Sequence, residues 1–323
     1  MTENKVRTKM TSVLEHITLF ESLRENHIPS LRVSTKTASS SFALARFSRF
    51  INKYLYKLGL GSALNRYDNS LTIYSAAADK KLYKDYSGDE VFCNFGSGAF
   101  FHKKWKNYDY PGQSEYYKTI QGKQGVDFTG IDLCKDDLLL PYGDNEVTLI
   151  YCSHTLEHLE ADLAQKFLLE CKRVLRDGGA MRVALPHTTN DFKMNAIINS
   201  QKNIPTDVKN NYCGQAASHI LADTAAVLND LEVKSLMLES NFSAPSFVSE
   251  AIKRGVSNKF LSSNPERHIS FWDYETLSTI SQDVGFKYCI PFYRGSSLAK
   301  PFLNLNVFDT TEPHISFYAE FIK

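Results

Sequence analysis

The chain has 323 residues and a formal net charge of +1 at pH 7, with 43% hydrophobic and 23% charged residues. This length suits one sizeable core with additions, and the composition is that of an ordinary globular protein. The near-neutral charge excludes a global attraction to nucleic acid or membrane, and neither a signal peptide nor an apolar run of about eighteen residues is present. We therefore predict a cytoplasmic protein.

Residues 1–89 are predicted to form a helical and irregular segment ahead of the main domain. No acidic residue occurs between Glu25 and Asp68, whereas basic residues recur there. Within 42–58 a basic stripe runs beside an apolar stripe at helical spacing, which predicts a basic amphipathic helix. Such a helix would act as a lid or would dock on an anionic membrane or an acidic substrate. The alternative is an ordinary helix with one face on the core and one in water.

From residue 90 onward, short apolar strands alternate with helical segments, which is typical of a parallel sheet with helices on both faces. Strands are predicted at 91–95, 105–108, 128–131, 147–152, 181–185, 286–291 and 315–321. Seven strands predict an α/β fold with one doubly wound, mostly parallel sheet over 90–323. The interval 188–264 is polar and includes a helical stretch at 216–231. We expect it to be an insertion after the fifth strand that covers the substrate.

Glycine or aspartate stands at the end of three consecutive predicted strands. The first ends in Gly96-Ser97-Gly98, where glycine lets the backbone approach a ligand closely. The second ends at Asp109, whose carboxylate can accept hydrogen bonds from both hydroxyls of a ribose. The third ends at Asp132 and Leu133, which suit the rim and face of an adenine, although an aspartate here also suits a helix or turn cap. These strand ends predict a nucleoside site, and the missing third glycine of GxGxxG weighs against a dinucleotide.

Three longer segments carry a family resemblance. The runs CNFGSGAFFHKKWKNYDYPG, GIDLCKDDLLLPYGDNEVTLIYCSHTLEHLE and RVLRDGGAMRVALP follow one another in the chain. In this order they resemble the type-11 branch of class I S-adenosylmethionine-dependent methyltransferases. The resemblance covers roughly 230 residues, from about 90 to 323, and is poor in the insertion. It implies a Rossmann-like class I fold, a transferase activity and S-adenosyl-L-methionine as cofactor.

The resemblance also assigns expected roles to the residues at the strand ends. It implies that Gly96-Ser97-Gly98 lines the methionine part of the cofactor. It implies that Asp109 binds the ribose, and that Asp132 with Leu133 binds the adenine. Ser153, just past the fourth predicted strand, would lie beside the sulfonium and the incoming acceptor.

Three histidines are candidates for taking a proton from an oxygen acceptor, because imidazole accepts protons near neutral pH. His154 follows the fourth predicted strand, His187 follows the fifth, and His268 precedes a helix expected near Asp273. A structural hydrogen bond is the alternative role for each of them.

The stretch from His154 to His158 has the spacing H-x-x-E-H, with Glu157 as its acidic member. On a helix these three side chains share a face, as in the zinc motif of inverted zinc peptidases, so a metal-dependent hydrolase is a rival function. The stretch also resembles quinone-type and small-RNA O-methyltransferases, which bind a divalent ion through E-x-x-E-H. Here a histidine replaces the first glutamate, so these three residues are metal candidates from an incomplete motif. The alternative is that Glu157 and His158 fix the first turn of a helix.

The acceptor has no motif of its own in the sequence. The resemblance suggests a sugar, a lipid-linked saccharide or another small molecule. No proline-aromatic signature follows the fourth predicted strand, where SHTL stands, which weighs against a nucleic-acid substrate. Because methyl transfer has no obligatory catalytic residue, a non-catalytic regulatory protein that binds S-adenosylmethionine or a nucleoside is the alternative function. The oligomeric state is left open.

Overall fold

The computed structural model describes Phe50 and residues 82–98, 100, 102–112, 118, 121, 127–220, 227–259, 267–305 and 307–323. The chain divides into two compact units, Met1–Ser87 with Ser296–Asn306 and Gly88–Gly295 with Val307–Lys323. Apart from Phe50, the predicted basic helix at 42–58 lies outside the described residues, so it stays a prediction. None of the described helices is both long and apolar enough to cross a membrane.

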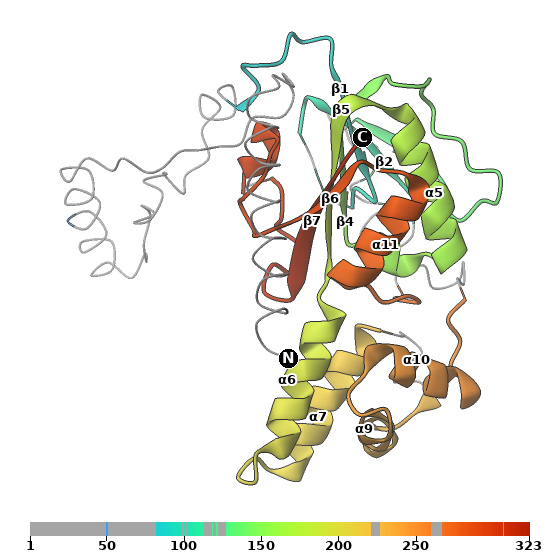
Figure 1. The fold of residues 1–323 in the computed structure, drawn as a ribbon, viewed down its shortest axis with the longest axis vertical. Coiled ribbons are helices and arrows are strands. Elements are labelled where there is room, and N and C mark those ends of the chain that lie inside the picture. Colours follow the sequence, from blue (N-terminus) through green and yellow to red (C-terminus); the bar gives the residue numbers. More distant parts are fainter. Residues whose placement is uncertain are drawn as a thin grey trace, which may run out of the picture. The chain divides into compact units, whose positions relative to one another are not determined.

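The larger unit is built around one sheet (Figure 1). The sheet has seven strands in the order β3-β2-β1-β4-β5-β7-β6. The strands are β1 (Val91–Phe95), β2 (Trp105–Asp109), β3 (Phe128–Gly130), β4 (Val147–Ser153), β5 (Leu175–Pro186), β6 (Tyr288–Phe292) and β7 (Ser316–Ile322). The first five pair in parallel, and β7 runs antiparallel to both β5 and β6. The predicted α/β fold with a mostly parallel seven-stranded sheet is confirmed.

Two strand starts differ from the predicted ones by more than one residue. β5 begins at Leu175 rather than at 181. Leu175 still pairs with Val147 of β4, beyond a register shift, so the strand extends further toward its N-terminus than predicted. β6 begins at Tyr288 rather than at 286, because Phe286 is still hydrogen-bonded to the end of the preceding helix α11 (Tyr274–Val284). Gly285 adopts a left-handed conformation with φ 87°, and the N–H of Phe286 donates to the Ser281 carbonyl at 2.9 Å.

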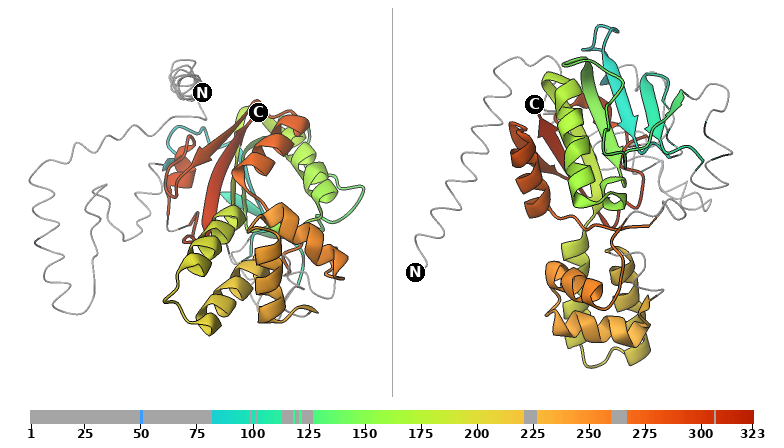
Figure 2. Two further views of the ribbon diagram at one scale, coloured as in Figure 1. Left: turned by 60° about the horizontal axis from the view of Figure 1, so that its bottom comes forward. Right: turned by 90° about the vertical axis from the view of Figure 1, so that its right-hand side faces the viewer.

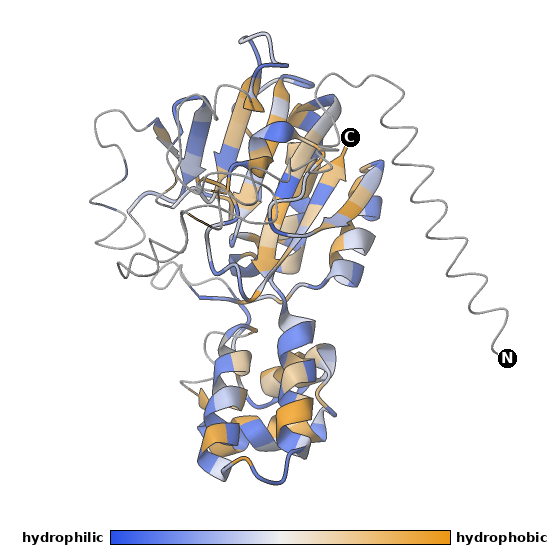
Figure 3. Ribbon diagram, turned by 90° about the vertical axis from the view of Figure 1, so that its left-hand side faces the viewer, coloured by the Kyte–Doolittle hydropathy of each residue, from blue (hydrophilic) through white to orange (hydrophobic). Residues whose placement is uncertain are grey.

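Helices α5 (Ala161–Val174) and α11 cover one face of the sheet, as Figures 1 and 2 show. The buried residues of α5 recur at helical spacing and form the apolar face that packs on the strands. Phe167 of this helix contacts Phe95 of β1 edge to face, with 5.4 Å between ring centroids. Apolar residues are concentrated in the strands (Figure 3), as expected for a parallel sheet buried between layers.

The insertion after β5 forms the helices α6 (Thr188–Ser200), α7 (Thr206–Ser218), α9 (Asp230–Glu239) and α10 (Ala244–Lys253). They lie beyond the carboxyl end of β5 (Figures 1 and 2). They carry a separate hydrophobic core, in which Phe192 and Phe247 pack edge to face with 5.3 Å between ring centroids. The single helix predicted at 216–231 is wrong. α7 ends at Ser218 and is followed by turn residues at 219–220, and the Asn229 side chain accepts the N–H groups of the first turn of α9 in a capping box.

Candidate functional site

The predicted cofactor residues meet at one edge of the sheet, because the carboxyl ends of parallel strands lie together. Asp109 ends β2, and its Oδ2 accepts the Gly98 N–H at 2.6 Å, which ties the loop after β1 to β2. The Asp109 carbonyl accepts the N–H of Ile131 at 2.8 Å, which brings the loop after β3 to the same place. The structure therefore brings together the strand ends that the sequence singled out.

The loops after β1 and β4 also pack tightly against each other. Gly96 has φ 67°, in the left-handed region that favours glycine, and a Cβ built on it lies 1.9 Å from Oγ1 and 2.8 Å from Cβ of Thr155. The Thr155 hydroxyl in turn donates to the Ser153 carbonyl at 3.2 Å. Both the dihedral and the close approach therefore require glycine at position 96.

Gly96→Ala is expected to lower the free energy of unfolding by about 2–3 kcal/mol, through left-handed strain and overpacking against Thr155. Gly255→Ala is the matched control, because Gly255 also has a positive φ, 92°, but nothing lies within 4 Å of a Cβ there. The control should lose about 1 kcal/mol, the strain alone. Urea unfolding measures both, and equal losses would contradict the packing role of Gly96.

The loop after β3 takes a conformation that the sequence allowed as an alternative. Asp132 accepts the Cys134 N–H through Oδ1 at 2.9 Å, so it caps a turn. Leu133 is 8% exposed and belongs to the main hydrophobic core. Both residues stand at the edge that carries Asp109, and their contacts with an adenine stay a prediction.

Two polar groups with little exposure stand at this edge of the sheet, the carboxylate of Asp109 and the hydroxyl of Ser153. Asp109 is only 6% exposed, and its two carboxylate oxygens accept the N–H groups of Gly98 and Tyr110, which fixes the carboxylate at this edge. The Ser153 hydroxyl at the end of β4 is buried and has no hydrogen-bond partner among the described residues. Buried polar groups normally find partners, so this edge suits a polar ligand, and the binding of a ribose at Asp109 and of the sulfonium near Ser153 stays a prediction.

His154 follows β4 directly and has φ 50°, an uncommon left-handed conformation for a residue other than glycine. Its Nε2 lies 2.7 Å from the hydroxyl of Ser316, the first residue of β7. Its Nδ1 lies 3.2 Å from Oε1 of Glu157. The imidazole is thus held from both sides at the edge where the acceptor is expected.

The H-x-x-E-H stretch does not form an α-helix, on which its three side chains would share a face. Leu156–His158 form a single 3-10 turn, Leu159 is extended and α5 begins only at Ala161. The left-handed conformation of His154 separates it from this turn, so the three side chains of the motif do not share a helix face. The zinc-peptidase arrangement is therefore not formed, because it requires these residues on a helix.

The turn instead places Glu157 next to His268, which comes from the segment before α11. Glu157 is 1% exposed. Burial raises the pKa of Glu157, but the contact with His154 and the charges of the neighbouring histidines outweigh it and hold this pKa below its usual value. Burial lowers the pKa of His268 to about 4, so this ring is neutral near pH 7.

The third histidine candidate has a structural contact. His187 caps α6, and its Nδ1 accepts the Asn190 N–H at 3.2 Å. Its ring packs against Phe317 with 5.3 Å between centroids. Burial lowers the pKa of His187. This arrangement matches the structural alternative for His187, whereas His154 and His268 both lie close to Glu157.

A cluster of buried charged residues, centred on Arg182 of β5, was not predicted from the sequence. Arg182 of β5 is fully buried and donates to Asp309 through Nε at 3.0 Å and a terminal nitrogen at 2.6 Å, and to Glu320 of β7 at 2.7 Å. The Asp309 N–H donates to the hydroxyl of Tyr151 in β4 at 2.7 Å. Arg182 is the single charge in the apolar part of β5 at 180–186, and Glu320 is the single charge in β7, so each was a readable signal for a buried ion pair.

A family model described as a methyltransferase domain matches residues 109–183. No curated protein matches the chain. Similar solved structures include an S-adenosylmethionine-dependent methyltransferase from Mesorhizobium loti, with 18% identity over 35% of this chain, 56% of that chain and a TM-score of 0.25. A second, from Aquifex aeolicus, has 13% identity over 76% of this chain and 88% of that chain, with a TM-score of 0.32. A third, from Archaeoglobus fulgidus, has 12% identity over 76% of this chain and 92% of that chain, with a TM-score of 0.36.

The family match runs from the end of β2 into β5, so it includes Asp109, the loop after β3 and the turn with Glu157. The strand order around this segment, with an antiparallel β7 inserted between β5 and β6, completes a Rossmann-like sheet. Residues 109–183 therefore match a methyltransferase domain of the type-11 branch, set in a sheet with the Rossmann-like class I strand order, and S-adenosylmethionine is the methyl donor of such domains.

Proposed function

We propose that the chain transfers a methyl group from S-adenosylmethionine to the hydroxyl of a small acceptor, with saccharides and lipid-linked saccharides as the first class to test. The observation that carries the proposal is the hydrogen bond from the Gly98 N–H to Asp109, within an edge that the methyltransferase-domain match reaches. The cofactor would lie over Gly96-Ser97-Gly98, with its ribose at Asp109, its adenine at Asp132 and Leu133, and its sulfonium near Ser153.

When bound, the cofactor supplies a methyl carbon on a positively charged sulfur. The protein then has to align the acceptor oxygen with the methyl carbon, on the side opposite the sulfur, and to take up the hydroxyl proton. His154, which follows Ser153, would take this proton at Nε2, where the acceptor hydroxyl would replace that of Ser316, while Glu157 holds Nδ1. Glu157 would stabilise the imidazolium that forms, since its carboxylate lies 3.2 Å from Nδ1 of His154.

The helices α6 to α10 support a covered acceptor site. They follow β5 at the edge that carries the cofactor residues, and their own hydrophobic core makes them a stable wall. We propose that this insertion, over about 188–264, limits which acceptors reach His154. The N-terminal segment at 1–89 would complete the cover, and its basic stretch at 42–58 would favour an anionic or membrane-linked acceptor.

Calorimetric titration of S-adenosylmethionine and its demethylated product into the full chain tests the proposal first. Micromolar binding of both is expected, followed by formation of demethylated product and methylated acceptor in equal amounts when saccharide acceptors are added. Binding without turnover across the acceptors would favour the regulatory alternative. A folded protein that binds neither ligand would contradict the proposal.

A further inference from the structure

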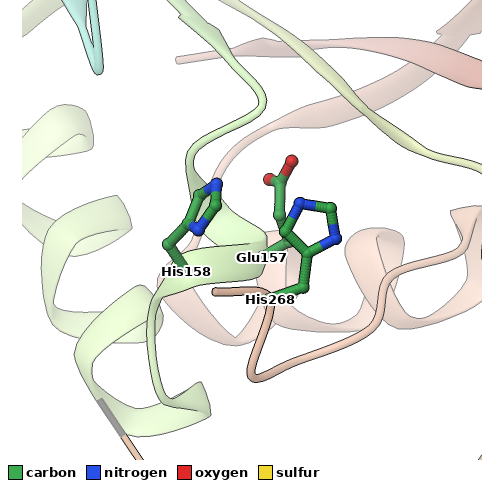
Figure 4. Close-up of side chains that lie close together, drawn as sticks. All are labelled: Glu157, His158 and His268. Carbon is green, nitrogen blue, oxygen red and sulfur yellow. The ribbon is translucent and has the colours of Figure 1, made fainter. Parts of the chain in front are cut away.

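Three side chains with metal-binding atoms converge beside the turn that follows β4 (Figure 4). Glu157 and His158 come from this turn, and His268 comes from the segment before α11. One ligand atom of each residue lies within 4.8 Å of those of the other two. Ligands about 3.4 Å apart suit a tetrahedral ion with bonds of about 2.1 Å, so small side-chain rotations suffice to close the cluster.

Backbone hydrogen bonds hold the two segments together without using the converging atoms. The Glu157 carbonyl accepts the N–H groups of Ile269 at 2.8 Å and Ser270 at 3.1 Å. The Ser270 hydroxyl donates to the carbonyl of Leu156 at 3.1 Å. The position of His268 relative to the turn is therefore fixed by the main chain, as a pre-organised site requires.

The converging atoms are left without partners of their own. Glu157 is 1% exposed, and neither of its carboxylate oxygens has a hydrogen-bond partner among the described residues. Nδ1 of His268 is also buried without a hydrogen-bond partner. Nδ1 of His154 lies 3.2 Å from Oε1 of Glu157 but supplies no well-directed hydrogen bond. Buried polar groups of this kind carry a desolvation cost that a bound cation would offset.

His158 has the tautomer that a metal ligand needs. Its Nδ1 lies 2.9 Å from the Arg267 carbonyl, which can only accept, so Nδ1 carries the proton and Nε2 keeps its lone pair. A metal-bound histidine commonly donates its other ring nitrogen to a carbonyl in this way. Behind the cluster, the ring of His219 lies 6.4 Å from that of His268 and is held by Asp191 at 2.8 Å.

We propose that Glu157, His158 and His268 bind one divalent transition-metal ion of the zinc class. Two imidazoles and one carboxylate favour Zn²⁺ or Co²⁺ over Mg²⁺ and Ca²⁺, which prefer ligand sets made of oxygen. Three protein ligands leave a coordination position for water or for an acceptor oxygen. The ligand set differs from the H-x-x-E-H motif read in the sequence, because His268 replaces His154.

The test uses the full chain, stripped with a chelator and titrated with Zn²⁺ alone, with metal content measured after gel filtration. One zinc per chain is expected, with a dissociation constant of about 1 µM or below. Glu157→Gln and His268→Ala should each weaken binding more than about 100-fold, because losing a ligand exceeds the effect of losing a second-shell contact. His314→Ala is the control, since this side chain is 72% exposed and should leave zinc binding unchanged.

Co²⁺ supplies an independent readout, because its visible absorption reports the ligands directly, and circular dichroism shows which variants are folded. If Glu157→Gln fails to fold, the zinc affinity of His268→Ala alone tests the proposal. Substoichiometric zinc in the wild-type protein, folded variants that bind zinc as tightly, or equal affinity for Mg²⁺ would each overturn the proposal. The site does not depend on methyl transfer, and titrating the zinc-free protein with S-adenosylmethionine tests that function separately.

Discussion

Replacing Arg182 with methionine is expected to lower the free energy of unfolding by about 3–5 kcal/mol, because the change leaves two buried carboxylates without their cation. Arg182, Asp309 and Glu320 are all 0% exposed. The guanidinium donates to both acids and also to the carbonyl of Tyr293 at 3.3 Å. It therefore joins β5, β7 and the loop that carries Asp309. Urea unfolding followed by circular dichroism measures the loss.

Arg254→Met is the matched control, because Arg254 pairs with Glu239 at the surface, with side chains 35% and 50% exposed. An exposed pair contributes at most about 1 kcal/mol, so the control should lose much less. Adding Glu320→Gln to Arg182→Met should recover part of the stability, since one uncompensated charge is removed. Equal losses at Arg182 and Arg254, or no recovery in the double variant, would contradict a structural role for the buried cluster.

Local patterns explain how much of the fold could be predicted from the sequence. All seven strands could be located, because apolar runs bounded by turn residues are short-range signals. The start of β6 was missed because Gly285 and Phe286 belong to the end of α11, which the strand pattern does not reveal. The H-x-x-E-H spacing brings its three side chains to one face only in a helix, and the left-handed conformation of His154, which the spacing does not reveal, prevents this.

The contacts that shape the site are mostly long-range, and this limits what sequence reasoning can reach. Glycine at position 96 could be recognised as a loop residue, but its contact with Thr155 depends on the pairing of β1 with β4. The charges of Arg182 and Glu320 stand out in the apolar sequence of their strands and could have suggested their pairing. Asp309 lies in a loop, 127 residues from its partner Arg182, and nothing in the local sequence indicates the contact. His268 could be named as a candidate base, but its place beside Glu157 required the fold.

Asp109→Ala is expected to weaken S-adenosylmethionine binding by about 100-fold in calorimetric titration. Two hydrogen bonds from ribose hydroxyls to a carboxylate contribute about 3 kcal/mol together, which corresponds to that factor. The substitution also frees the N–H groups of Gly98 and Tyr110, which the two carboxylate oxygens accept at 2.6 and 2.7 Å. The loss therefore has two sources, the ribose contacts and the shape of the glycine loop.

Asp109→Asn separates these two sources. Its amide oxygen can still accept the Gly98 N–H, so the loop is kept, but the charge is lost and one acceptor becomes a donor. We expect a loss of about tenfold, between wild type and Asp109→Ala, because hydrogen bonds to charged groups are roughly twice as strong as neutral ones. Asp162→Asn, at the exposed start of α5, should leave the affinity unchanged. If both Asp109 variants fold and bind as wild type does, Asp109 only holds the glycine loop, and the ribose must be bound by other residues at this edge.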